Sequence, residues 1–154
     1  MGKKKVSVCG NGYSVGPNMR RVSAIPLEED EQIAFVQWCR LNHILVHHSG
    51  NEIGGSTSAM KARAVKMKKM GTSKGFPDLL LFLPVKNLIN GRVDAYQPIA
   101  IEMKRQKGST TSPEQKEWLR IFEKSGIPCA VCKGCEKAIK FVREQMAEIS
   151  GDEI

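Results

Sequence analysis

Apolar positions recur along the chain at the two spacings that distinguish helices from strands. Segments with apolar residues three or four positions apart predict helices, and short apolar runs bounded by glycine, proline or polar residues predict strands. The expected order is helix 28–41, strand 44–48, helix 57–70, strand 79–83, strand 98–103, helix 112–126, strand 127–132 and helix 136–149. A chain of 154 residues with this order is expected to form one α/β domain.

Three of the predicted helices carry apolar residues that indicate which side they bury. Helix 28–41 has four acidic residues in its first turn, where the helix dipole favours negative charge, followed by a broad set of apolar positions: Ile33, Ala34, Val36, Trp38 and Leu41. Helix 57–70 has a stripe at i, i+4 and i+7, and we expect its members to be buried: Met60, Ala64 and Met67. The final helix has an inner stripe of Ala138, Val142 and Met146.

Turn and capping signals add detail to this order. Asn90-Gly91 lies between strands 79–83 and 98–103 and is typical of a hairpin, so these strands are expected to be antiparallel neighbours. The run Ser112-Pro113-Glu114-Gln115 predicts a helix start, with a serine N-cap, a proline in the first turn and Gln115 as a possible capping-box partner.

Two of the predicted strands have an acidic residue beside an otherwise apolar run. Asp78 precedes Leu79, and Glu102 lies near the end of the next strand with Lys104 two positions later. Because strand side chains alternate in direction, Glu102 and Lys104 project from the same face. If the strands are neighbours, two carboxylates and an ammonium group converge, which suits a divalent metal that holds a phosphate and a water molecule.

The sequences Pro77-Asp78 and Glu102-Met103-Lys104 resemble the active-site motif of PD-(D/E)xK nucleases. The ordered set Gly75-Phe-Pro-Asp, Ile-Glu-Met-Lys, Ser112-Pro-Glu-Gln-x-x-Trp-Leu and Gly126-Ile-Pro resembles the VRR-NUC (virus-type replication-repair nuclease) family over roughly residues 28–142. The resemblance implies a restriction-endonuclease-like αβββαβ core with a central mixed sheet flanked by helices, in which helix 57–70 is an insertion between the first two strands. It further implies a Mg²⁺-dependent DNA endonuclease, with Mn²⁺ as a substitute, that acts as a homodimer on Holliday junctions or flaps in phage replication, recombination or repair.

The resemblance also assigns roles to individual residues. Asp78 and Glu102 would hold Mg²⁺ with the Met103 carbonyl as an extra ligand, and Lys104 would orient the attacking water. Glu31 is the best match to a helix-borne acid over the metal site, although Glu28 and Glu29 compete with it. Gln115 would hydrogen-bond near the site, or serve only the capping box. Taken singly, Asp78 is also compatible with a turn residue, and Glu102 and Lys104 with a solvated strand face.

The charge balance favours a nucleic-acid partner. Lys and Arg number 24 against 16 Asp and Glu, which gives a net charge of +8 and a pI near 9.4. The basic side of helix 57–70 and the residues beside the proposed site form a candidate phosphate track: Lys61, Lys66, Lys68, Lys69, Lys74, Arg105 and Lys107. The alternative is an ordinary solvated surface. A non-catalytic nucleic-acid-binding protein, and a restriction-like or RNA nuclease, remain alternatives to the DNA endonuclease.

The remaining sequence features concern domain organisation and cellular location. We expect a basic flexible arm over residues 1–24, one nuclease domain over 25–149 and a flexible end over 150–154. No apolar stretch is long enough to span a membrane, and no secretory signal follows the basic start. We therefore expect a cytoplasmic protein, in the host cytoplasm if viral. We expect no small-molecule cofactor.

The spacing of Cys129, Cys132 and Cys135 suggests a zinc site, but a nearby fourth ligand is missing. As strand residues, Cys129 and Cys132 would point to opposite faces. His47 and His48 either face the proposed site or end a solvated strand.

Overall fold

The structure is a computed structural model that describes residues 26–50, 57–87 and 89–151. Its elements follow the predicted order: α1 (Glu28–Leu41), β1 (Leu45–His48), α2 (Ser58–Lys69), β2 (Leu79–Lys86), β3 (Val93–Lys104), α3 (Pro113–Lys124), β4 (Cys129–Lys133) and α4 (Cys135–Ser150). The predicted arm over residues 1–24 and most of the predicted C-terminal segment lie outside the described residues.

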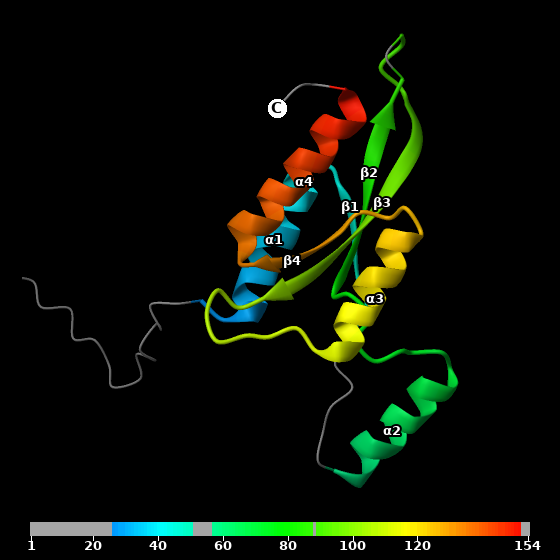
Figure 1. Cartoon of the computed structure of the whole chain (residues 1–154), viewed down its shortest axis with the longest axis vertical. Helices are drawn as coiled ribbons and strands as arrows, with labels where there is room; N and C mark the ends of the chain where they lie inside the picture. The colour runs from blue at the N-terminus through cyan, green and yellow to red at the C-terminus, as the bar shows by residue number, and fades with distance from the viewer. Residues whose placement is uncertain (1–25, 51–56, 88, 152–154) are drawn as a thin grey trace, which may run out of the picture.

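The four strands form one mixed sheet in the order β1-β2-β3-β4. β1 pairs with β2 and β2 with β3 in antiparallel fashion, whereas β3 and β4 are parallel. Helices α1 and α4 pack together on one face of the sheet, and α3 lies against β4 on the other (Figure 1). The α/β fold with a mixed sheet and a helix inserted between the first two strands is therefore confirmed.

The core lies between the sheet and the pair of helices α1 and α4. Alternate residues of β2 and β3 point into it and are fully buried: Leu79, Leu81, Leu83, Ile99, Ile101 and Met103. Helix α4 contributes the predicted stripe, in which Ala138 and Val142 are fully buried and Met146 is partly buried. Because this face takes the odd-numbered residues of β3, Glu102 and Lys104 project from the opposite face, toward α3.

The predicted inner face of α1 was only partly right. Its buried residues are Glu31, Phe35 and Cys39, four positions apart along one narrow line of the helix. Ile33 and Leu41, which we expected to be inside, are 50% and 81% exposed. The helix therefore buries one line of residues against α4 and the sheet, and the broad apolar set could not reveal which line this is.

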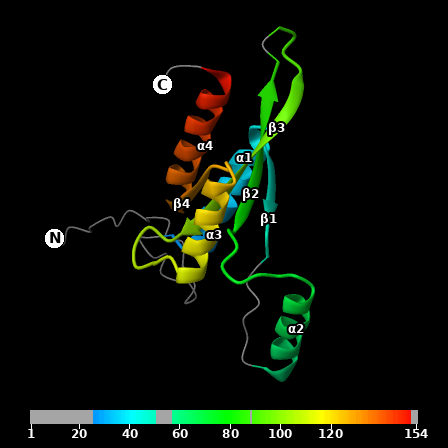
Figure 2. The ribbon, with the colours of Figure 1, turned by 45° about the vertical axis from the view of Figure 1, so that its right-hand side comes forward.

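The expectation that Met60, Ala64 and Met67 form a buried stripe is wrong. No residue of α2 is buried, and Met60 is 45% exposed. Among the described elements, none makes extensive contact with α2. Figure 2 shows the helix standing away from the sheet, as it does in Figure 1. The i, i+4, i+7 pattern is present, but no other part of the described chain covers it.

No helix within the described residues is both long enough and apolar enough to cross a membrane.

Candidate active site

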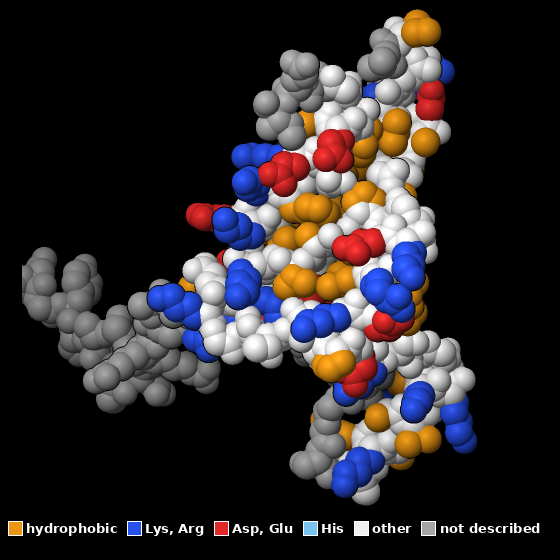
Figure 3. Space-filling model, viewed as in Figure 1, with side chains coloured by type: hydrophobic (Ala, Val, Ile, Leu, Met, Phe, Trp, Pro, Cys, Tyr) orange, Lys and Arg blue, Asp and Glu red, His pale blue; other side chains and the backbone are white. Residues whose placement is uncertain are grey.

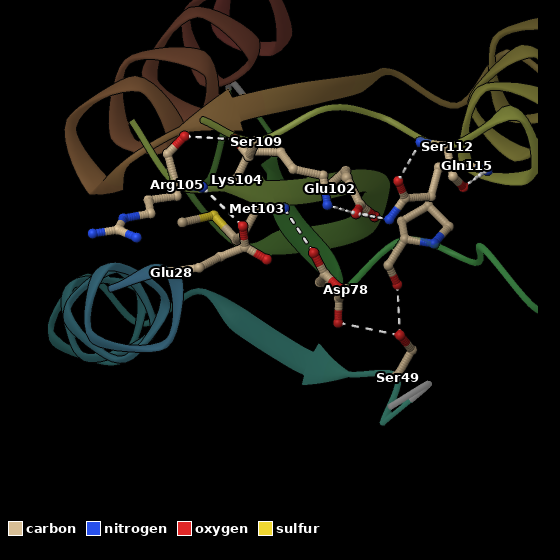
Figure 4. Close-up of polar contacts among 11 residues, drawn as sticks. Glu28, Ser49, Asp78, Glu102, Met103, Lys104, Arg105, Ser109, Ser112 and Gln115 are labelled. Carbon is tan, nitrogen blue, oxygen red and sulfur yellow. Dashed lines mark hydrogen bonds and ion pairs between the residues drawn. The ribbon is translucent and has the colours of Figure 1, made fainter. Parts of the chain in front are cut away.

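The ends of β2 and β3 bring the predicted acidic residues together. Leu79 pairs with Ile101 across the two antiparallel strands, so the preceding Asp78 and the following Glu102 lie at the same end of the pair. The Met103 backbone N–H donates a hydrogen bond to Asp78 Oδ2 over 2.8 Å. Figure 4 shows Asp78, Glu102 and Lys104 gathered at this point. The structure thus places side by side the three residues that the sequence pattern singled out.

Glu102 is held inside the protein by two donors and has one oxygen left over. Its side chain is 1% exposed, and its Oε1 accepts hydrogen bonds from Lys104 Nζ at 2.6 Å and from the amide nitrogen of Gln115. Its Oε2 is buried and has no hydrogen-bond partner among the described residues. A buried carboxylate oxygen without a donor is costly. The site therefore presents an acceptor that a cation would satisfy.

Burial changes the protonation of both carboxylates. Desolvation, helped by the Asp78 charge, raises the pKa of Glu102 to about 7, against the opposing effect of the Lys104 hydrogen bond. Desolvation also raises the pKa of Asp78, although the Met103 N–H and the Lys104 ammonium group act in the other direction. Two desolvated acids whose charges repel each other are poised to bind a cation in place of protons.

Lys104 remains charged at neutral pH. Burial alone lowers its pKa, but the hydrogen bond to Glu102 and the charges of Glu102, Glu28 and Asp78 outweigh burial and raise the pKa above its ordinary value. An ammonium group in this state can neutralise a phosphate and orient a water molecule. It does not have the depressed pKa that a general base would need.

The structure places Glu28, rather than Glu31, beside these residues. The Glu28 charge acts on Asp78, Glu102 and Lys104, and its Oε2 accepts a hydrogen bond from the Arg105 backbone N–H over 2.8 Å. Glu31 is 7% exposed and turns elsewhere. Its Oε1 accepts from Gln106 Nε2 at 2.5 Å and its Oε2 from the Cys135 backbone N–H at 2.7 Å. Glu31 thus joins α1 to the beginning of α4.

Gln115 combines the two roles that the sequence left as alternatives. Its Oε1 accepts from the Ser112 backbone N–H at 2.8 Å, which completes the capping box of α3. Its Nε2 donates to Glu102 Oε1. The start of α3 is therefore tied to a carboxylate of the site, and the orientation of the Gln115 amide group is determined at both ends.

The segment that leads to Asp78 is fixed on two sides. Ser49 Oγ donates to the Pro77 carbonyl at 2.5 Å, and the Ser49 backbone N–H donates to the Asp78 carbonyl at 2.9 Å. Sequence reasoning missed Ser49, because a serine after a short strand has no distinctive pattern. On the other side, Trp118 Nε1 of α3 donates to the Lys74 carbonyl at 3.2 Å.

Phe76 and Gly75 complete the contact with α3. The ring of Phe76 lies 5.0 Å from the ring of Trp118 and 5.5 Å from that of Phe122, both in edge-to-face geometry. Gly75 has a φ of +79° and lies so close to α3 that a Cβ atom there would be 2.7 Å from the backbone of Glu114 and Gln115. The approach to Asp78 therefore requires glycine.

The basic residues of the proposed phosphate track separate into two groups. The first group lies near the site. Lys74 forms an exposed ion pair with Glu114 at 2.6 Å, and Lys107 is exposed. Arg105 is half-buried, and its Nε is buried without a hydrogen-bond partner among the described residues. The other group lies on α2, away from the carboxylates: Lys61, Lys66, Lys68 and Lys69. His47 and His48 are exposed, and the His48 charge is close enough to act on Asp78.

The donor set at Asp78 and Glu102 fits a hard cation. Within the described part of the chain, no group of three or more His, Cys, Asp or Glu side chains is arranged to hold a metal. An ion held by Asp78 and Glu102 would complete its shell with main-chain, water or substrate oxygen, as Mg²⁺ commonly does.

The three cysteines considered as zinc ligands have different environments. The Cys129 thiol donates a hydrogen bond to the Leu119 carbonyl, Cys132 is buried in the core and Cys135 begins α4.

Comparisons with known proteins agree with this geometry. The profile of the VRR-NUC domain matches residues 20–136. A solved structure, a VRR_NUC domain protein, is 25% identical in sequence and superposes with a TM-score of 0.55, covering 81% of this chain and 91% of its own. Among curated proteins, none matches this chain.

Proposed function

The chain belongs to the VRR-NUC family, whose domain implies a nuclease-type function, and from this premise we propose that it is a Mg²⁺-dependent DNA endonuclease. The proposed substrate is branched DNA, such as a Holliday junction or a flap, in viral or phage replication, recombination or repair in the host cytoplasm. One observation carries the proposal: the buried Glu102 Oε2 has no donor among the described residues and lies in a site that also contains Asp78 and Lys104.

Asp78 and Glu102 would hold the ion, with the Met103 carbonyl as a further ligand and Glu28 in the place that the sequence pattern gave to Glu31. When bound, Mg²⁺, or Mn²⁺ in its stead, supplies a Lewis acid that polarises the scissile phosphate and lowers the pKa of a water molecule. Lys104, held charged by its ion pair, neutralises the phosphate and orients the water. Gln115 keeps the Glu102 carboxylate in position through its amide group.

The substrate phosphate would meet positive charge near the carboxylates. Arg105 follows β3 directly, and its backbone is fixed by Glu28 and Ser109. Together with the exposed Lys107 and Lys74, it offers positive charge next to the carboxylates. Carboxylates that can hold a cation, with basic side chains nearby for the phosphate, are what a metal-assisted phosphodiesterase needs.

The test compares the wild type with Asp78→Asn on a four-way junction, a flap, a linear duplex and single-stranded RNA, with Mg²⁺ or with EDTA. We expect wild-type cleavage only with Mg²⁺, preference for the branched substrates, and a loss of about 10³-fold in Asp78→Asn. The matched control is Asp94→Asn, because Asp94 is an exposed acid of β3 whose carboxylate bonds Asn87 near the hairpin turn. It should cut like the wild type.

Two results would contradict the proposal in different ways. Identical behaviour of wild type and Asp78→Asn on every substrate would remove the catalytic assignment and leave a nucleic-acid-binding protein. Faster cleavage of RNA than of any DNA would change the substrate class while keeping the site.

A homodimer completes the proposal, because a two-fold pair presents two sites to the two strands of a branched substrate. Light scattering of the purified protein at micromolar concentration should give twice the 17.1 kDa chain mass. A monomeric mass with and without junction DNA would remove this part and leave the chemistry of the site unaffected.

A further inference from the structure

Helix α2 precedes the segment that leads to Asp78, and no other described element packs extensively against it. No side chain from Ser58 to Lys69 is buried by the described residues. An isolated helix of 12 residues is marginal in water, because most helical stability in proteins comes from packing. The structure therefore contains an element that is encoded as a helix but lacks the contacts that normally keep one formed.

Local signals alone account for the helix. Thr57 Oγ1 caps the first turn by accepting from the Met60 backbone N–H at 3.3 Å. Three lysines lie in the last turn, where the helix dipole favours positive charge: Lys66, Lys68 and Lys69. Each of these effects is worth on the order of 1 kcal/mol or less. They bias the segment toward a helix without fixing it.

The charge of α2 indicates what its missing partner is. Its basic residues are Lys61, Arg63, Lys66, Lys68 and Lys69, and it contains no acidic residue. Figure 3 shows Lys and Arg side chains spread over the helix with apolar ones between them. Lysines clustered on one short helix repel one another and oppose its formation. A polyanion placed along the helix would reverse that effect, and a nucleic-acid backbone carries a regular row of negative charges.

The base of α2 is anchored separately from the helix itself. Ser49 holds the Asp78 carbonyl at one end, and Trp118 holds the Lys74 carbonyl at the other. Between Met70 and Ser73 the chain has no comparable tie to α3, and Gly71 adopts a φ of +99° with open space around it. Movement of the helix can therefore take place without displacing the carboxylate of Asp78.

We propose that α2 is a clamp for the nucleic-acid backbone that becomes stably helical only when the phosphates of the substrate lie along it, an inference that rests on the proposed nuclease function. In the free protein the helix forms and melts readily. On the substrate, its lysines neutralise phosphates a short distance from the cleaved bond, while Asp78 keeps its place.

The first experiment measures binding without cleavage, in Asp78→Asn protein with EDTA. A variant of helix α2, called the α2 variant, carries Lys61→Gln, Lys66→Gln, Lys68→Gln and Lys69→Gln. The matched control carries the same charge change at exposed lysines elsewhere: Lys86→Gln, Lys124→Gln, Lys137→Gln and Lys140→Gln. Fluorescence anisotropy with a labelled four-way junction and a labelled duplex, between 50 and 200 mM salt, gives the slope of log K against log salt.

We expect the α2 variant to reduce the magnitude of that slope by up to about 3.6, since each of four neutralised phosphates contributes about 0.9, whereas the control should change it by less than about 1. Because α2 buries nothing, both variants should melt at the wild-type temperature. Equal slopes for the α2 variant and the control would overturn the proposal. The same four substitutions in the wild-type background test cleavage, and a loss of cleavage with an unchanged binding slope would overturn it too.

The second experiment follows amide hydrogen exchange in residues 60–70 of the Asp78→Asn protein. The expected result is fast exchange in the free protein and at least tenfold slower exchange with saturating duplex. Slow exchange that depends on protein concentration without DNA would show that a second copy covers the helix. Slowing by anionic phospholipid vesicles but not by duplex would show a membrane partner; either result overturns the proposal. The cleavage test with Asp78→Asn is independent of these outcomes. A wrong role for α2 can therefore be distinguished from a wrong assignment of nuclease function.

Discussion

Helices α2 and α3 are both 12 residues long and both begin with a hydroxyl side chain as N-cap, yet their relations to the site are opposite. Helix α3 packs Trp118 and Phe122 against Phe76, and its Gln115 holds Glu102. Helix α2 buries no residue, and its lysines lie away from the carboxylates. A hydroxyl N-cap thus begins both helices, but tertiary contacts decide which one is fixed.

The difference matches two different tasks. Under the proposed function, hydrolysis needs carboxylates and an ammonium group held in fixed positions, and the contacts of α3 would hold them. The proposed branched substrate varies in shape, so a helix that binds it through charge could adapt where a packed surface could not. Each prediction below tests one side of this comparison, in order of decreasing effect.

The largest effect is expected where the chain touches α3. Gly75→Ala places a Cβ atom 2.7 Å from the α3 backbone at a φ of +79°, so we expect a loss of about 3 kcal/mol in unfolding free energy and impaired cleavage. Gly71→Ala, at the end of α2, has a φ of +99° and nothing within 4 Å, and it should cost about 1–2 kcal/mol with cleavage retained. Urea unfolding compares the two, and equal losses would show that α3 does not constrain the approach to Asp78.

The next largest effect is expected from substitutions that separate the two roles of Gln115, its part in the capping box of α3 and its hydrogen bond to Glu102. Ser112→Ala and Gln115→Ala both break the capping box, at a cost of about 1 kcal/mol each. Only Gln115→Ala also frees Glu102, so we expect kcat to fall roughly 10- to 100-fold in that variant and to stay near the wild-type value in Ser112→Ala. Steady-state cleavage of a flap substrate measures this. A similar fall in both variants would assign the effect to the helix end alone.

Binding of Mg²⁺ should stabilise the site in a pH-dependent way. The pKa of Glu102 is raised from 4.5 to about 7 by burial, so its contribution to stability is fully present below pH 4.5 and is lost as the pH rises through about 7. Mg²⁺ competes with the proton and should offset this loss. At 100 times its Kd, Mg²⁺ adds about 2.7 kcal/mol, seen as a higher Tm at pH 8 and much less at pH 5.5.

The Asp78→Asn variant is the control for this prediction and should show no Tm response to Mg²⁺ at either pH. If its response equals that of the wild type, the ion binds elsewhere. Hydrogen exchange in α2 should be the same with and without Mg²⁺, because the ion acts at the fixed end of the molecule.

The smallest effect is expected in α2. Met60→Gln and Met67→Gln should change the unfolding free energy by less than about 0.5 kcal/mol, since neither side chain is buried. In α3, Phe122→Ala should cost about 2 kcal/mol, because it loses its contacts with Phe76 and Trp118. Thermal melts of the three variants would reveal a hidden partner of α2 if either methionine substitution matched the cost of Phe122→Ala.

Sequence reasoning succeeded where one periodicity determined the outcome. The alternation of side chains in a strand was enough to place Glu102 and Lys104 on one face, and the hairpin signal made β2 and β3 neighbours. It could not decide between the acids of α1, because Glu28 and Glu31 are three residues apart and point in similar directions around the helix. Only their separation of about 4.5 Å along its axis decides which one meets the site.

It failed for α2 for a different reason. The apolar positions Met60, Ala64 and Met67 do recur at helical spacing, but a pattern within a segment carries no information on whether another segment lies opposite it. The connection of Gln115 to Glu102 could be anticipated only as one of two alternatives, because an amide group has two functional ends and the sequence does not show that both are used.

The hydrogen bond between Glu31 and the Cys135 backbone has a consequence for the order of biosynthesis. The two residues are 104 positions apart, so the helix that carries Glu28 is fastened only after the ribosome has released the beginning of α4. A nascent chain that already contains both strand acids should therefore lack a finished catalytic centre.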